Sequence, residues 1–161
     1  LVDGKKIENS QDFRRYQNLI SFVSQDTFLL EDSIKNNILF GSEQTVDDQK
    51  LKSALDFSSL SEFVEELPDK LDTIIGLNSK KISSGQRQRI ALARLYYSSR
   101  EILIFDEATN ALDEKNEELI INNIINLKEI KTVIIVSHNK KNLLKCDKLF
   151  HVKNGSVTEE K

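Results

Sequence analysis

Residues 102–107 read ILIFDE, a continuous apolar run of strand length that ends in two acidic residues. Such a run is typical of a parallel strand that is buried on both faces. A second run, TVIIV at 132–136, ends at Ser137-His138, and a helical periodicity over 114–127 separates the two. Strand, helix and strand in this order predict a right-handed crossover, so we expect an α/β fold with a mainly parallel sheet.

Weaker patterns predict further elements on both sides of this unit. We expect a short helix capped by Ser10, a strand at 20–23, helices over 32–67 with a capping box at Thr45 and Asp48, a helix after 83–85, a helix at 140–144 and a strand at 149–152.

The composition narrows the class of protein. With 39% hydrophobic and 30% charged residues, the 161-residue chain is neither disordered nor membrane-like. A net charge of -3 gives no reason to expect nucleic acid as a partner. The single cysteine, Cys146, cannot form an internal disulfide, which fits a reducing compartment. Because the chain lacks methionine and begins Leu-Val-Asp, we expect it to be a piece of a longer protein.

Polar residues follow three of the expected strands. Gln25 follows the strand at 20–23, Asp106 and Glu107 end the second, and His138 follows the third. Functional groups of parallel sheets gather at the carboxyl ends of the strands. These side chains could together hold a metal ion and a water molecule, although each alone also fits a helix cap or a turn.

The segment 82–86, ISSGQ, leads into an expected helix. Small residues before a helix leave backbone N–H groups and the positive end of the helix dipole exposed, which favours an anion. An ordinary serine N-cap is the alternative interpretation of the same segment.

Taken together, these motifs resemble the nucleotide-binding domain of ABC transporters. The segment 82–86 resembles the LSGGQ signature and is followed by RQR at 87–89, as is usual in the family. The segment 102–107 resembles the Walker B strand, 108–113 the segment that leads into the D-loop, Gln25 the Q-loop glutamine and His138 the switch histidine. The resemblance covers nearly the whole chain.

The resemblance implies the mainly parallel sheet of a P-loop NTPase (RecA-like) core with an inserted α-helical subdomain, truncated at its N-terminus. Residues 1–25 would be the remnant of the catalytic core up to the Q-loop, and 26–81 the helical subdomain. Residues 82–161 would carry the signature helix, Walker B, the D-loop and the switch histidine.

The resemblance also implies ATP and Mg²⁺ as cofactors. Glu107 would be the base for the attacking water, and His138 would contact the γ-phosphate and orient Glu107. Asp106 would hold the Mg²⁺ shell. Gln25 would touch the metal or its water and sense the transmembrane domain.

The expected partners are a second nucleotide-binding domain, identical or different, and a transmembrane domain fused upstream. Two such domains would clamp two ATP molecules head to tail at the cytoplasmic face of a membrane. The signature residues would meet the ATP of the opposite subunit, and Asp113 would cross the dimer interface. These signature residues are Ser83, Ser84, Gly85 and Gln86.

The sequence departs from the family pattern in three places. No GxxxxGK[ST] phosphate loop is present, so we expect this chain alone to bind ATP poorly and to be inactive. Ser84 stands where glycine is usual, and would be strained if the position needs a positive φ. Leu77 and Ser79 replace the glutamate and glycine of a segment that resembles the exporter X-loop.

Within the family, the stretches 32–41 and 63–68 resemble exporters. We therefore expect the ATP-binding and ATP-hydrolysing domain of a membrane exporter, with a substrate that the sequence does not identify. Two alternatives stay open: a soluble ABC ATPase that acts on ribosomes or DNA, and a non-catalytic remnant that completes a partner's site.

Overall fold

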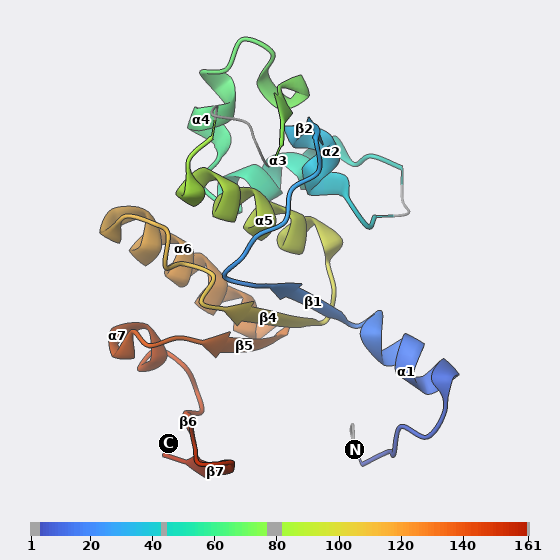
Figure 1. The fold of residues 1–161 in the computed structure, drawn as a ribbon, viewed down its shortest axis with the longest axis vertical. Helices are drawn as coiled ribbons and strands as arrows, with labels where there is room; N and C mark the ends of the chain where they lie inside the picture. Colours follow the sequence, from blue (N-terminus) through green and yellow to red (C-terminus); the bar gives the residue numbers. More distant parts are fainter. Residues whose placement is uncertain (1–3, 43–44, 77–81, 161) are drawn as a thin grey trace.

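The computed structural model describes residues 4–42, 45–76 and 82–160. Its centre is a three-stranded parallel sheet in the order β1 (Ile20–Val23), β4 (Ile102–Asp106) and β5 (Thr132–Val136) (Figure 1). The connection from β4 to β5 runs through α6 (Glu114–Asn126). The predicted α/β class and the parallel strand–helix–strand unit are confirmed.

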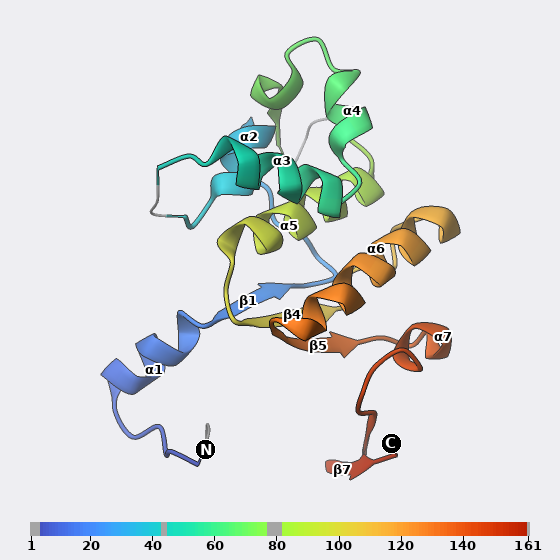
Figure 2. The ribbon, with the colours of Figure 1, turned by 180° about the vertical axis from the view of Figure 1, so that it is seen from behind.

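One face of this sheet packs against α5 (Ser84–Ser98) and α6, which lie on the same side of it (Figures 1 and 2). Leu103 and Phe105 of β4 point into that core and are almost completely buried. The prediction that the strands are buried on both faces is wrong. Residues alternate between buried and half-buried along β4, and between half-buried and exposed along β5. The physical reason is that the described residues put helices on one face only.

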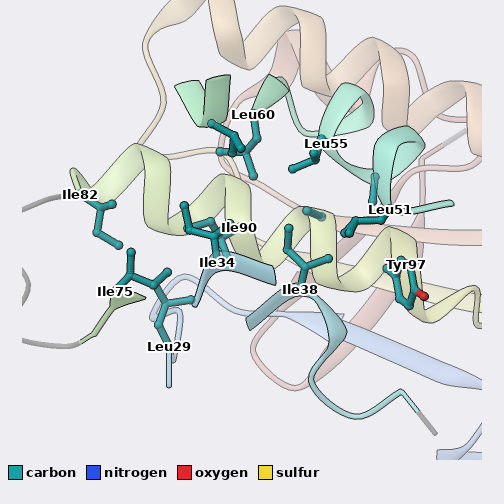
Figure 3. Packing of buried hydrophobic residues seen from close by; sticks show 13 residues of the cluster. Leu29, Ile34, Ile38, Leu51, Leu55, Leu60, Ile75, Ile82, Ile90 and Tyr97 are labelled. Carbon is teal, nitrogen blue, oxygen red and sulfur yellow. The ribbon is translucent and has the colours of Figure 1, made fainter. Parts of the chain in front are cut away.

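A second layer of short elements lies on the other side of α5 (Figure 2). It contains β2 (Asp32–Ser33), α2 (Ile34–Leu39), α3 (Asp48–Phe57), α4 (Ser61–Glu65), the 3₁₀ turn η1 (Lys70–Asp72) and β3 (Ile74–Ile75). Here β2 and β3 form a short antiparallel pair, so the stretch predicted as helical begins with a strand. Figure 3 shows the apolar core of this layer, in which Ile34, Leu60 and Ile90 are fully buried.

Two predicted helix caps are wrong. Helix α1 (Ser10–Gln17) is capped by Asn9, whose side chain accepts a hydrogen bond from the Asp12 N–H, and not by Ser10. Helix α3 is capped by Asp47, which accepts from the Lys50 N–H, and not by Thr45 with Asp48. In both cases the capping residue has an extended backbone, which an N-cap requires.

A 3₁₀ turn, η2 (Leu127–Glu129), lies between α6 and β5. After β5 come the short helix α7 (Lys140–Leu143) and a hairpin of β6 (Phe150–Lys153) and β7 (Ser156–Glu159). The predicted strand at 149–152 is present, but it pairs with β7 rather than with the central sheet. Asn154 and Gly155 make the turn with positive φ angles of 50° and 75°, as a tight hairpin requires.

Among the described residues, no helix is long and apolar enough to cross a membrane. The departures predicted at Leu77 and Ser79 lie outside the described residues.

Candidate functional site

The sheet register brings the predicted strand-tip residues to one edge. Asp106 is paired with Val136, and the Glu107 N–H donates a hydrogen bond to the Val136 carbonyl at 3.0 Å. His138 follows two residues after that pair. Gln25 follows two residues after β1, the other neighbour of β4. The parallel arrangement therefore places the predicted carboxylates, imidazole and amide on neighbouring strand ends.

Glu107 has an unusual backbone and a largely buried side chain. Its φ is +52°, in the left-handed region that non-glycine residues seldom adopt. Its side chain is only 11% exposed. Asn110 Nδ2 donates a hydrogen bond of 2.5 Å to Oε2, which fixes the carboxylate from one side. A strained backbone that aims a carboxylate is typical of a functional site.

The other carboxylate oxygen of Glu107 faces the histidine. His138 Nε2 lies 3.3 Å from Glu107 Oε1, although the His138 side chain is 98% exposed. The contact lacks the alignment of a hydrogen bond, so Oε1 is a buried acceptor that has no hydrogen-bond donor in the described chain. A water molecule bound there could lose a proton to Oε1, since a positioned carboxylate can act as a general base.

Sequence reasoning missed Gln88, which links α5 to this loop. Its side chain is buried; Nε2 donates to the Glu107 carbonyl at 3.2 Å, and Oε1 accepts from the Ala111 N–H at 3.0 Å. One amide thus holds both ends of the segment that follows β4. The only sequence signal was a polar residue on the apolar face of an expected helix.

The segment predicted to bind an anion forms the start of α5. Ser83 caps the helix by accepting from the Gln86 N–H at 3.1 Å, and Gln86 Oε1 accepts from the Ser83 N–H at 2.8 Å. This is a complete capping box, so the alternative interpretation as a serine N-cap is confirmed. Capping and anion binding are compatible because several N–H groups of the first turn have no helical partner.

The two residues that follow Ser83 differ in how strictly the fold requires a glycine at their position. Ser84 is the first residue of α5 and is not among the residues with positive φ, so its side chain causes no backbone strain. Gly85 is required by a close approach, because a Cβ there would lie 2.9 Å from the Ala111 carbonyl oxygen. The start of α5 is therefore packed directly against the segment that carries Asp113.

Asp113 is the exposed N-cap of α6. Its side chain accepts from the Asn116 N–H at 3.1 Å and from Asn116 Nδ2 at 2.6 Å. The hydrogen bond from the Asn116 side chain, with a smaller contribution from the nearby Arg89 charge, lowers the pKa of Asp113. The lowered pKa keeps this exposed carboxylate charged, and both of its oxygens accept a hydrogen bond from Asn116.

A groove of about 530 Å³ lies between the segment that follows β1 and the start of α5. It brings Gln25 into the same wall as Ser84, and its lining also includes Phe28, Arg87, Gln88 and Ala111. Of the predicted site residues, Glu107 and His138 thus meet directly, and Gln25 and Ser84 share the groove.

Two of the predicted site residues carry oxygen donors of the kind that magnesium binds. The described residues contain no group of three or more His, Cys, Asp or Glu that could hold a metal ion. Asp106 and Gln25 offer one carboxylate and one amide oxygen. Mg²⁺ is often bound by only one or two carboxylates and completed by water and substrate phosphates. The residues therefore fit Mg²⁺ that arrives with a phosphate ligand.

Comparison with known proteins gives a consistent picture. The model of the family described as "ABC transporter" matches residues 1–110. The chain is 38% identical, over 99% of its length, to an ATP-dependent lipid A-core flippase of Pseudoalteromonas translucida. It is 34% identical, over 98%, to a multidrug resistance ABC transporter ATP-binding and permease protein of Lactococcus lactis.

The matches cover only part of those relatives, since the chain spans 27% and 26% of their lengths. Among solved structures, a bacterial Atm1-family ABC exporter with ATP bound superposes with a TM-score of 0.82 at 29% identity, over 89% of this chain and 25% of that one. The motif order, the fold and these relatives agree, and the chain belongs to the ABC transporter family, whose nucleotide-binding domain it resembles.

Proposed function

We propose that this chain is the larger, C-terminal part of the nucleotide-binding domain of an ABC exporter, which hydrolyses ATP to drive export or flipping of a substrate. The observation that carries this proposal is the desolvated Glu107 carboxylate beside His138, within the fold of an ABC exporter. The division into residues 1–25, 26–81 and 82–161 is part of the same proposal.

In this proposal Glu107 Oε1 accepts the proton of the water that attacks the γ-phosphate. The buried oxygen has no competing hydrogen-bond donor in the described chain, so it is available to that water. Asn110 holds the second oxygen and limits rotation of the carboxylate. In the same proposal, His138 contacts the phosphate and keeps Glu107 in position; its exposed side chain lies 3.3 Å from Glu107 Oε1, which supports this role.

Asp106 and the Gln25 amide would hold Mg²⁺ or its water. When bound, the ion neutralises charge on the phosphates. The signature residues lie on the exposed start of α5, where Ser83 and the free N–H groups around Gly85 suit the γ-phosphate of a nucleotide on a second domain. Asp113 is exposed, and in this proposal it contacts the second domain across the dimer interface.

The open edge of the sheet supports a further part of the proposal. The outer edge of β5 has no paired strand within the described residues. We propose that the strand leading into the phosphate-binding loop pairs along β5, from a segment that precedes Leu1.

A fused transmembrane domain would precede that segment, so the nucleotide-binding domain would work at the cytoplasmic face of a membrane. The chain alone would then hydrolyse little ATP.

Of the alternatives, neither is favoured by a particular observation. Both relatives described above are named as membrane transport proteins, in contrast to a soluble ATPase. A remnant that only completes a partner's site would not need the buried Glu107 carboxylate beside His138.

The test uses Glu107→Gln in the complete polypeptide encoded by the gene. The amide keeps the shape of the side chain but cannot accept the proton, so turnover should fall by about 10²–10⁴-fold, while ATP binding persists. Turnover by phosphate release and binding by equilibrium dialysis are measured on the same preparation. Turnover close to that of the wild type would sink the assignment of Glu107 as the base.

A further inference from the structure

A single carboxylate oxygen joins the segment that carries Glu107 to the segment that carries His138. Glu117, in the first turn of α6, accepts three hydrogen bonds at Oε1. They come from Thr109 Oγ1 at 3.2 Å, from Asn139 Nδ2 at 3.3 Å and from Asn142 Nδ2 at 2.8 Å. Thr109 belongs to the segment after β4, and the two asparagines belong to the segment that follows His138. Thr109 and Asn142 are buried, so these contacts are shielded from water.

The histidine itself needs such an anchor. Its side chain is 98% exposed, so packing does not fix the imidazole. Its position depends on the backbone of the loop that it occupies. Within that loop, the Asn139 N–H donates to Ser137 Oγ at 3.0 Å, and Asn139 Oδ1 caps α7 by accepting from the Lys141 N–H. These bonds are internal to the loop and do not tie it to the rest of the protein. Glu117 does.

Glu117 also touches the segment that carries Asp113. Its N–H donates to the Asp113 carbonyl at 2.8 Å, in the first turn of α6. One residue therefore contacts the Asp113 backbone on one side and the His138 loop on the other. A displacement of Asp113 could therefore reach the histidine loop through Glu117.

We propose that Glu117 is a positioning residue that holds His138 Nε2 against Glu107 Oε1 and transmits contacts made at Asp113 to that pair. The inference rests on the proposed function, because it assigns the role of Glu117 in the same reaction. Glu117, His138 and the two asparagines all lie beyond residues 1–110, the part matched by the family model.

The experiment measures ATP hydrolysis by the complete polypeptide. Glu117→Ala removes the acceptor, so kcat should fall by about tenfold or more, because small misplacements of reacting groups are costly. KM for ATP should change by less than about twofold, since binding is not affected. Glu117→Gln keeps an oxygen that can accept at Oε1, and its kcat should stay within about threefold of the wild type.

A double-mutant cycle separates positioning from a merely structural role. If Glu117 acts through His138, then Glu117→Ala should lower kcat no further in a His138→Ala background. Two independent, multiplying effects would overturn the proposal, and so would a wild-type kcat for Glu117→Ala.

A second variant covers the case in which Glu117→Ala does not fold. Asn139→Asp retains the oxygen that caps α7, but replaces the donor to Glu117 by a second carboxylate, so the two groups repel. Its kcat should fall as that of Glu117→Ala does, and an unchanged kcat would overturn the proposal.

The proposed function fails separately from this inference. If Glu107→Gln turns over ATP as fast as the wild-type protein does, the proposed function itself is contradicted. A protein that needs Glu107 but tolerates both Glu117→Ala and Asn139→Asp contradicts only the role of Glu117.

Discussion

The two layers of the molecule use similar apolar residues with different results. In the helical layer, Ile34 and Leu60 are fully buried against α5 (Figure 3). In the sheet, Ile134 and Val136 occupy a strand of equally apolar sequence and remain 44% and 49% exposed. The difference lies in the partners, because the described residues cover only one face of the sheet. An apolar run therefore predicts that a strand will be covered, without saying which segment covers it.

The largest expected effect is a difference in stability between these layers. Leu60→Ala should destabilise the chain by about 2–5 kcal/mol, because it opens a cavity in a closed core. Ile134→Ala should cost less than about 1 kcal/mol, since much of that side chain stays in contact with water. Urea unfolding of both variants measures the two values. Equal losses would show that the sheet face is covered in solution.

The same pair sharpens the comparison in the complete polypeptide. If a further segment covers the open face of the sheet there, the cost of Ile134→Ala should rise toward that of Leu60→Ala. A cost that stays small in the longer protein would show that this face remains exposed to water there as well.

The junction between the layers should show an intermediate effect. Gly85→Ala places a Cβ 2.9 Å from the Ala111 carbonyl oxygen, so the start of α5 must move away from that segment. We expect a loss of about 1–3 kcal/mol in the free energy of unfolding. Ser84→Gly is the matched control, and it should cost less than about 1 kcal/mol because Ser84 is unstrained. Thermal unfolding compares the two, and a larger loss for Ser84→Gly would reverse the explanation given for both positions.

The smallest effect concerns pH. The Asn116 hydrogen bonds lower the pKa of Asp113 in the folded state, so the charged carboxylate stabilises the fold. That stabilisation is present above the ordinary aspartate pKa of about 4 and is lost as the pH falls through the lowered folded-state value. NMR titration of Asp113 should therefore give a pKa below the ordinary value, and Asn116→Ala should raise it. An unchanged pKa in that variant would assign the shift to another group.

Sequence patterns predicted the elements whose own residues form a continuous apolar run or a clear helical periodicity. The runs at 102–106 and 132–136 became neighbouring parallel strands, and the helix between them was placed within a residue or two. The order of motifs also predicted that Glu107 and His138 would meet, because parallel strands bring their carboxyl ends to one edge.

Other features depend on tertiary neighbours and left no local signal. Gln88 and Glu117 stand among other polar residues in their helices, and the folded chain shows which loops they join. The predictions of two helix caps were wrong for a different reason. Asn9 and Asp47 each stand next to a plausible alternative, and the backbone conformation that decides between them is not visible in residue types.

The left-handed backbone of Glu107 has a consequence for how this site can evolve. Glycine, asparagine and aspartate adopt a positive φ at low cost, whereas β-branched residues resist it. Random drift at this codon would therefore meet few substitutions that leave the loop intact, and the tolerated ones are small or acidic. A lineage in which asparagine or glycine replaced Glu107 could keep a correctly folded domain without the carboxylate that we propose as the base, so the fold would be inherited for longer than the proposed activity.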